Sequence, residues 1–257
     1  MKTLNVDVAV IGAGTAGLAA YRAAVAEGRR TVLIEGGAYG TTCARVGCMP
    51  SKLLIAAAEA AHAPQKWAEF GLRLDGSLVI DGKAVMARVK RERDRFVGFV
   101  LDGVDAIPDS DHIRGYARFL DDSTLAVDDH TRIAFGRAVV ATGSSPTIPA
   151  ALRAAGDRLI VNDDVFAWDD LPRAVAIFGP GVIGLELGQA LHRLGVDVVL
   201  FGRSGHVGLF SDPAIRAYAG PRPCEISCIT TTDRYPSIDA RAAWSSRISS
   251  LPIGSTT

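Results

Sequence analysis

Residues 8–37 read VAVIGAGTAGLAAYRAAVAEGRRTVLIEGG. A four-residue apolar run leads into a turn with three glycines, an amphipathic helix follows and ends at Gly28, and a second apolar run comes after it. Residues 175–204 repeat this pattern without a gap, with Gly195 at the end of the helix, and read VAIFGPGVIGLELGQALHRLGVDVVLFGRS. Each copy is typical of a βαβ unit with parallel strands. The sequence therefore predicts an α/β fold with two Rossmann-like, nucleotide-binding lobes.

The first glycine turn predicts a dinucleotide site. Gly12 permits the tight turn, Gly14 lets a pyrophosphate approach the backbone, and Gly17 lets the helix pack on the strand. The phosphates would then meet the free N–H groups at the positive end of the helix dipole. Glu35 ends the second apolar run and suits a hydrogen bond to ribose hydroxyls. The alternative is a glycine-rich turn beside a surface glutamate.

The second turn has the same surroundings but a different strand end. Its three glycines are Gly179, Gly181 and Gly184. Gly202 takes the place of Glu35, and Arg203 and Ser204 follow it. A carboxylate there would repel a 2′-phosphate, whereas an arginine offers a forked cation for one. We therefore expect NADP rather than NAD in this lobe; the alternative is that Arg203 points to solvent.

The segments between the two copies predict further elements of the first lobe. Residues 81–104 have the pattern of a long helix with a mixed charged face, capped by Asp81. Residues 112–140 predict short strands, with turns at 121–123 and 128–130, and residues 138–146 predict an apolar strand that ends in a small-residue loop. These strands form a small β-rich insertion in the first lobe.

Three regions follow from these patterns. We expect a first domain over residues 1–148, an incomplete second domain over 149–219, and an atypical tail over 220–257 that is disordered or frame-shifted. Of the 38 residues from Gly220 to Thr257, 16 are Ser, Thr or Pro and none is Lys. No helix or strand period persists there, so no strand is predicted to follow the second βαβ unit.

Composition excludes some partners. The chain has 28 basic and 28 acidic residues, which gives no electrostatic argument for nucleic acid. No run of 18 uncharged apolar residues is present, so a membrane span is not expected. Asp7 and the glycines interrupt the apolar N-terminal run, which argues against a secretory leader and for the cytoplasm.

Two of the four cysteines lie close together in residues 41–52, TTCARVGCMPSK. In the cytoplasm a pair such as Cys43 and Cys48 is more often catalytic or metal-binding than a permanent structural disulfide. A zinc site would need a second pair, and Cys224 and Cys228 lie in the atypical tail, so we expect no metal. A redox pair at the start of a helix is favoured, because the helix dipole stabilises a thiolate there.

These motifs together resemble the pyridine nucleotide–disulfide oxidoreductases. The cysteine pair is followed by Pro50 and Lys52, and the other matching motifs are GYARF (115–119), ATGSSP (141–146) and GLELG (184–188). The resemblance covers residues 4 to about 219. It implies that Cys43 exchanges with substrate, that Cys48 faces the flavin, and that Lys52 lies near the flavin, paired with Glu186. The further FAD contacts that it implies are with Thr42, Ala117, Thr142 and Gly143. Without the resemblance, Lys52 and Glu186 would be read as surface residues.

The resemblance implies FAD as cofactor and a reaction in which hydride passes between NAD(P)H and FAD and electrons pass through the Cys43–Cys48 disulfide. We expect a lipoyl-type or other small disulfide or dithiol substrate, as in dihydrolipoyl dehydrogenase, with glutathione or mercuric reductase as runners-up. A non-catalytic FAD-binding fragment and a flavin monooxygenase-like enzyme are the alternatives.

The chain departs from the family at several places. Thr41 stands where the family usually has glycine, and Arg45 stands where it usually has asparagine. Family members are nearly twice as long, and they form homodimers through a C-terminal domain for which this sequence shows no counterpart. We therefore expect impaired turnover from this chain.

Overall fold

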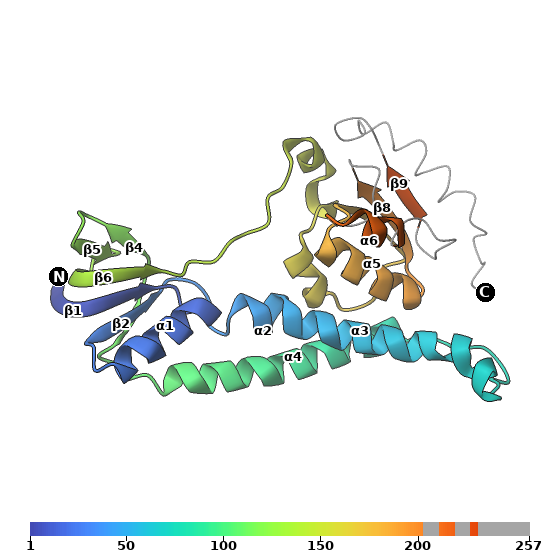
Figure 1. Cartoon of the computed structure of the whole chain (residues 1–257), viewed down its shortest axis with the longest axis horizontal. Helices are drawn as coiled ribbons and strands as arrows, with labels where there is room; N and C mark the ends of the chain where they lie inside the picture. Colours follow the sequence, from blue (N-terminus) through green and yellow to red (C-terminus); the bar gives the residue numbers. More distant parts are fainter. Residues whose placement is uncertain (203–210, 219–226, 231–257) are drawn as a thin grey trace. The chain divides into compact units, whose positions relative to one another are not determined.

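The computed structural model describes residues 1–202, 211–218 and 227–230, and its chain divides into two compact units (Figure 1). The first unit comprises residues 1–56, 83–146 and 163–170. The second comprises residues 57–82, 147–162 and 171–257. The predicted tail over 220–257 lies outside the described residues, except for one short strand in the second unit.

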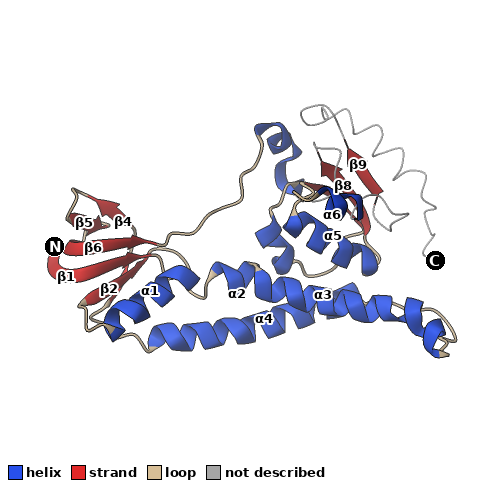
Figure 2. Ribbon diagram, in the orientation of Figure 1, coloured by secondary structure: helices blue, strands red, loops and turns tan. Residues whose placement is uncertain are grey.

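The first unit is a mixed α/β structure with a six-stranded sheet in the order β3-β2-β1-β6-β5-β4 (Figure 2). Its strands are β1 (Lys2–Ile11), β2 (Thr31–Glu35), β3 (His112–Arg114), β4 (Ala117–Phe119), β5 (Thr124–Val127) and β6 (Thr131–Val140). Its helices are α1 (Thr15–Ala26), α2 (Thr42–Val46), α3 (Cys48–His62, which continues into the second unit) and α4 (Gly82–Asp105). Strands β3, β2, β1 and β6 are parallel neighbours, whereas β5 and β4 are antiparallel. The predicted α/β fold, the long helix and the short strands are confirmed.

Strand β1 separates two apolar clusters because successive side chains of a strand point to opposite faces. Ala9 and Ile11 join a cluster with β2, β3, β5 and β6 side chains. Val10 lies on the other face, in a cluster with Leu18 of α1 and Val104 of α4. Both clusters are buried, so the sheet is covered on each side of β1 and its carboxyl end is held in place.

Tyr21 fixes α1 from within the second of these clusters. Its hydroxyl donates to Asp111 Oδ2 at 2.9 Å, just before β3. Burial and this carboxylate raise the pKa of Tyr21 to about 12. The phenol therefore stays protonated and hydrogen-bonded at any physiological pH.

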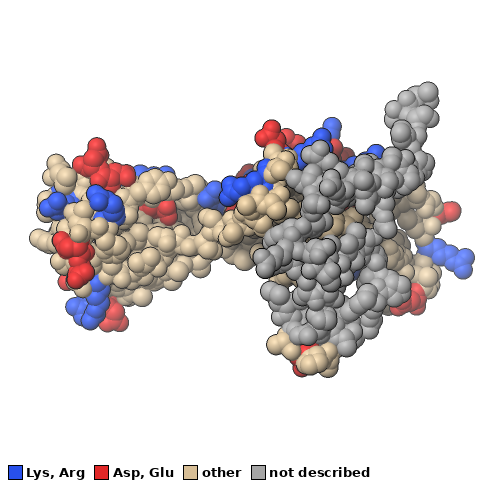
Figure 3. All heavy atoms as spheres, turned by 90° about the horizontal axis from the view of Figure 1, so that it is seen from above, with Lys and Arg blue, Asp and Glu red and all other residues tan. Residues whose placement is uncertain are grey.

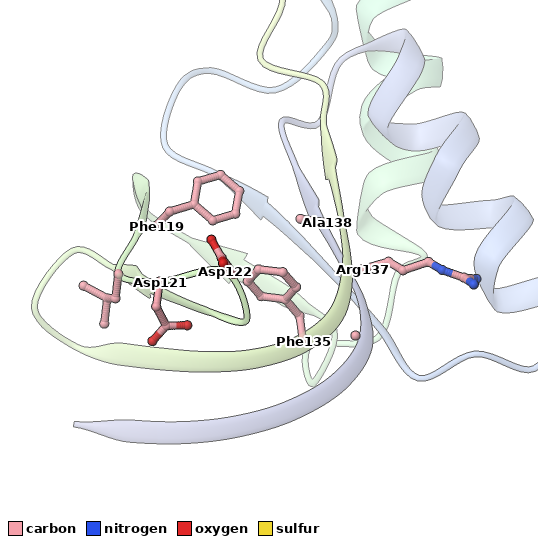
Figure 4. A pocket seen from close by; sticks show the side chains of 8 residues that line it. Phe119, Asp121, Asp122, Phe135, Arg137 and Ala138 are labelled. Carbon is pink, nitrogen blue, oxygen red and sulfur yellow. The ribbon is translucent and has the colours of Figure 1, made fainter.

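The antiparallel hairpin β4–β5 forms the predicted β-rich insertion and carries an open pocket of about 570 Å³ (Figure 4). The rings of Phe119 and Phe135 meet edge to face there, with centroids 5.8 Å apart. Asp121 and Asp122 come from the hairpin turn, and Arg137 extends away from the rings. The wall is thus aromatic on one side and acidic at the turn.

The second unit contains the second βαβ unit, with β7 (Ala174–Phe178), α5 (Val182–Arg193) and β8 (Asp197–Gly202). Strands β7 and β8 are parallel, as predicted. The remaining elements are α6 (Pro213–Tyr218), β9 (Ser227–Thr230) and 3-10 helices at Ala63–Phe70 and Ala150–Arg158; a third such helix, Asn162–Ala167, lies almost wholly in the first unit.

The prediction that no strand follows the second βαβ unit is wrong. Strand β9 pairs in parallel with β8, with Val199 opposite Ser227 and Gly202 opposite Thr230. Four residues are too few to show a strand period in sequence, and a polar neighbourhood masks them further. The pairing gives β8 a neighbour on each side.

The surface agrees with the balanced charge. On the visible face of the described residues, acidic and basic side chains are interspersed (Figure 3). Within residues 1–202, 211–218 and 227–230, no helix has both the length and the apolar character needed to cross a membrane.

Candidate active site

The first glycine turn is tightly built against the protein's own backbone. Gly12 has a φ of +104°, and a Cβ placed on it would lie 2.3 Å from the carbonyl oxygen of Ala141. A Cβ on Gly17 would lie 1.7 Å from the carbonyl oxygen of Gly12. Both positions exclude any side chain, because these neighbours are backbone atoms that cannot swing away.

Gly14 is different, because its side-chain position faces open space. A Cβ on Gly14 would meet nothing within 4 Å, and its φ of −76° suits any residue. It is the N-cap of α1 and makes no side-chain capping bond. Internal packing therefore does not require glycine here. Free space in front of a helix N-terminus fits the pyrophosphate of a dinucleotide.

Glu35 closes the turn with both carboxylate oxygens. The N–H of Ala13 donates to Oε2 at 2.8 Å, and the N–H of Gly37 donates to Oε1 at 2.7 Å. The carboxylate thereby ties the glycine turn to the loop that leaves β2. Each oxygen keeps a second lone pair, so the predicted bond from a ribose hydroxyl is still available.

The second turn repeats this geometry in the second unit. Gly179 has a φ of +124°, and a Cβ placed on Gly184 would lie 2.1 Å from the carbonyl oxygen of Gly179. The N–H of Gly179 donates to Phe201 O at 3.0 Å, as the N–H of Gly12 donates to Ile34 O at 2.8 Å. Gly181, like Gly14, would meet nothing within 4 Å. Arg203 and Ser204 lie outside the described residues.

The two cysteines stand on two helical segments, which corrects the expectation of one helix. Cys43 lies in the five-residue α2, and Cys48 is the first residue of α3. Gly47 breaks the helix between them with φ −128° and ψ −118°. A Cβ on Gly47 would lie 3.2 Å from Cys43 Cα, so the two segments fold closely on each other.

The two thiols interact in this arrangement. A hydrogen bond with Cys48 is the main cause that raises the pKa of Cys43, and burial of the thiol is the second cause. Both cysteines are free thiols, with Cys43 half-buried and Cys48 exposed. The two thiol groups therefore lie within hydrogen-bonding reach of each other, and the reversible disulfide stays a prediction.

Thr41 enters α2 in a conformation that suits glycine. Its φ of +58° and ψ of +147° are strained for a β-branched residue. Its hydroxyl oxygen partly offsets the strain by accepting from the N–H of Ala44 at 3.1 Å. The Arg45 guanidinium binds the preceding loop, because it donates to Ala38 O at 3.3 Å. Both departures from the family therefore bear on the loop between β2 and α2.

We expect Thr41→Gly to give a more stable protein than Thr41→Ala, by about 1–3 kcal/mol. Both variants lose the side-chain cap, which costs about 1 kcal/mol for alanine but only about a few tenths of a kcal/mol for glycine, and only glycine releases the backbone strain. Urea unfolding of the full chain, followed by circular dichroism, measures the difference. Equal midpoints for the two variants would show that Thr41 is not strained.

Cys43 opens onto a pocket of about 390 Å³ that the sequence did not reveal. Its wall includes Thr15, the first residue of α1, and Thr41. Most of the rest is apolar, with Arg22 as a cation: the other lining residues are Leu18, Arg22, Ala44, Met49, Phe96, Phe99 and Val100. These side chains come from α1, α2, α3 and α4, and no local sequence pattern connects them.

The other predicted residues are placed as follows. Thr42 is exposed beside Cys43, and Thr142 and Gly143 are exposed just after β6, with the N–H of Thr142 on the Gly12 side. Ala117 begins β4, next to Tyr116, whose ring packs on Gly36. Lys52 is exposed on α3 in the first unit and Glu186 half-buried on α5 in the second. Their pairing stays a prediction.

Comparisons with known proteins agree with this geometry. The sequence matches the pyridine nucleotide-disulphide oxidoreductase family over residues 6–221. It is 35% identical over 215 residues to mercuric reductase of Shigella flexneri, which covers 81% of this chain and 38% of that protein. It is 36% identical over 219 residues to mercuric reductase of Acidithiobacillus ferrooxidans, with 82% and 39% covered. Dihydrolipoyl dehydrogenase 2 of Haloarcula marismortui is 30% identical over 207 residues, with 77% and 43% covered.

The fold also matches a solved structure. The HOCl-induced flavoprotein disulfide reductase RclA of Escherichia coli superposes with a TM-score of 0.69 at 20% identity, covering 87% of this chain and 48% of that one. The chain spans 38–44% of the length of the curated relatives named above and of others like them. On its family match, its paired cysteines and its two glycine turns, the chain belongs to the pyridine nucleotide-disulphide oxidoreductase family.

Proposed function

We propose that this chain carries the FAD site and the redox centre of a flavin-dependent dithiol–disulfide oxidoreductase. The observation that supports it most is the pocket shared by Thr15, at the glycine turn, and Cys43. A dinucleotide on the first turn and the Cys43 thiol would thus meet in one cavity. FAD, if bound there, would supply a two-electron acceptor and donor for the cysteine pair.

The thiols themselves carry out the exchange. The Cys43 thiolate attacks one sulfur of the substrate disulfide, forms a mixed disulfide and releases one substrate thiolate. The Cys48 thiolate then attacks Cys43 Sγ, which releases the second substrate thiolate and leaves the Cys43–Cys48 disulfide. Two electrons have then left the protein, and reduced nicotinamide restores them. We assign this nicotinamide site to the second glycine turn, with NADP favoured over NAD because Gly202 ends β8 and Arg203 follows it.

The pocket favours an apolar disulfide or dithiol of the lipoyl type. Met49, Phe96 and Phe99 offer an apolar, polarisable wall for a hydrocarbon chain. Arg22 offers a cation for a carboxylate or amide oxygen. Glutathione disulfide and mercuric ion are the runners-up, and several similar proteins are named mercuric reductase. A homodimer and a cytoplasmic location stay predictions from the sequence.

The test combines flavin and thiol measurements on the full chain. We expect purified protein to bind FAD, and the oxidised and reduced forms to differ by two titratable thiols, because Cys43 and Cys48 pair. A Cys224→Ser/Cys228→Ser background serves as control.

The outcomes separate the candidate functions. FAD binding with an unchanged thiol count would favour a non-catalytic fragment or a monooxygenase-like flavoprotein and overturn the disulfide relay. A protein that changes by two thiols but binds no FAD would overturn the flavin assignment instead.

A further inference from the structure

One pair of neighbouring positions carries different residues in the two repeats. In the first repeat, the N–H of Ala13 donates to Glu35 Oε2 at 2.8 Å. At the matching places the second repeat has Pro180 and Gly202. Proline has no N–H, and glycine has no carboxylate, so donor and acceptor are missing together.

The Pro180 ring also blocks the side-chain position of residue 202. A Cβ built on Gly202 would lie 2.7 Å from Pro180 Cγ and 3.3 Å from its Cδ. These atoms belong to a ring closed on the backbone, so they cannot rotate away as a flexible side chain would. Any side chain at the end of β8 therefore requires the glycine turn to move.

The proline removes no donor that a phosphate needs. In the first repeat, the equivalent N–H is already used by Glu35 and faces the strand end. The open position at Gly181 and the N-terminus of α5 remain as in the first turn. The second turn therefore keeps its phosphate cradle and loses only the acidic partner of the ribose.

We infer that Pro180 and Gly202 form a specificity-determining pair that keeps a carboxylate away from the ribose 2′ position and so selects a 2′-phosphorylated dinucleotide. The inference rests on the proposed nucleotide site of the second turn. Pro180 is a positioning residue: it need not touch the nucleotide, and it acts by blocking the side-chain position of residue 202. Gly202 acts by leaving the space empty.

The contact itself is tested by stability in the full chain. We expect Gly202→Ala to lower the melting temperature by roughly 4–8 °C and to have little effect when combined with Pro180→Ala. Gly181→Ala is the matched control, because a Cβ there meets nothing within 4 Å. Equal effects of Gly202→Ala with and without Pro180→Ala would overturn the pair.

Selectivity is tested by titrating the same proteins with NADP⁺ and NAD⁺. We expect the unaltered chain to prefer NADP⁺, Gly202→Glu alone to weaken binding of both, and Pro180→Ala/Gly202→Glu to improve NAD⁺ binding roughly 10- to 100-fold over the single Gly202→Glu variant. If Gly202→Glu alone gains NAD⁺ as well as the double variant does, the inference fails while the nucleotide site stands. If the unaltered chain binds neither dinucleotide, the proposed function of the second turn fails, and the melting temperatures still report on the contact.

Discussion

Gly17→Ala will strongly destabilise the first unit, whereas Gly14→Ala will leave it folded and will weaken the proposed binding of FAD. The added Cβ at position 17 would lie 1.7 Å from the Gly12 carbonyl oxygen, so helix α1 must separate from the turn. We expect a loss of at least about 3 kcal/mol, at the upper end of overpacking costs. At position 14 the Cβ enters open space, and folding stability should change by less than about 1 kcal/mol.

The two effects are read by different measurements. Urea unfolding of the flavin-free chain gives the stability, and fluorescence titration gives the FAD affinity. We expect Gly14→Ala to bind FAD about 10- to 100-fold more weakly, because the methyl group holds the pyrophosphate away from its N–H donors.

The second unit provides the matched control. Gly184→Ala should destabilise its own unit, since its Cβ would lie 2.1 Å from Gly179 O, and should leave FAD binding unchanged. If Gly14→Ala binds FAD as well as the unaltered chain does, no phosphate lies at this turn.

The second large effect is on the lifetime of a mixed disulfide at Cys43. In a Cys224→Ser/Cys228→Ser background, a small aromatic disulfide reagent should release two thiolates from the reduced unaltered pair. Cys48→Ser should release one and keep the adduct on Cys43. The resolving thiol stands beside Cys43, so we expect its loss to lengthen the adduct's lifetime by more than about 10³-fold. Mass spectrometry of the adduct against time measures it, and Cys43→Ser is the control.

The same pair predicts a pH dependence. The hydrogen bond with Cys48 raises the pKa of Cys43, which keeps Cys43 protonated to higher pH. Cys48→Ala removes this cause, so the pH midpoint for alkylation of Cys43 should move to lower pH. An unmoved midpoint, or one that moves upward, would show that Cys48 does not govern the Cys43 thiol. In the mixed-disulfide experiment, rapid release of two thiolates from the Cys48→Ser variant would contradict the roles assigned to the two cysteines.

The repeat explains why the sequence predicted the two βαβ units. Glycines at 12, 17, 179 and 184 are required by backbone contacts that recur in both copies, so their spacing alone carries the geometry. The long helix α4 and the strands after it follow local periodicity in the same way.

What the sequence missed depends on contacts between distant segments. Arg22 and Phe99 reach the Cys43 pocket from helices far apart in the chain. The bend at Gly47 that places the cysteines on two helices leaves no periodic signal, since glycine is compatible with many conformations. The direction of Arg45 is set by a loop carbonyl rather than by its place between the cysteines.

The place of β6 in the sheet has a consequence for how this chain is made. Strand β1, at residues 2–11, pairs over nearly its whole length with β6, at residues 131–140, and Ala141 then forms the wall against Gly12. A growing polypeptide on the ribosome therefore holds the first glycine turn long before it can close it. Until β6 emerges, β1 has an unpaired apolar edge of the kind that joins other chains. Chaperone protection of the nascent chain during that interval, rather than the final stability of the fold, would then govern how much protein reaches the folded form.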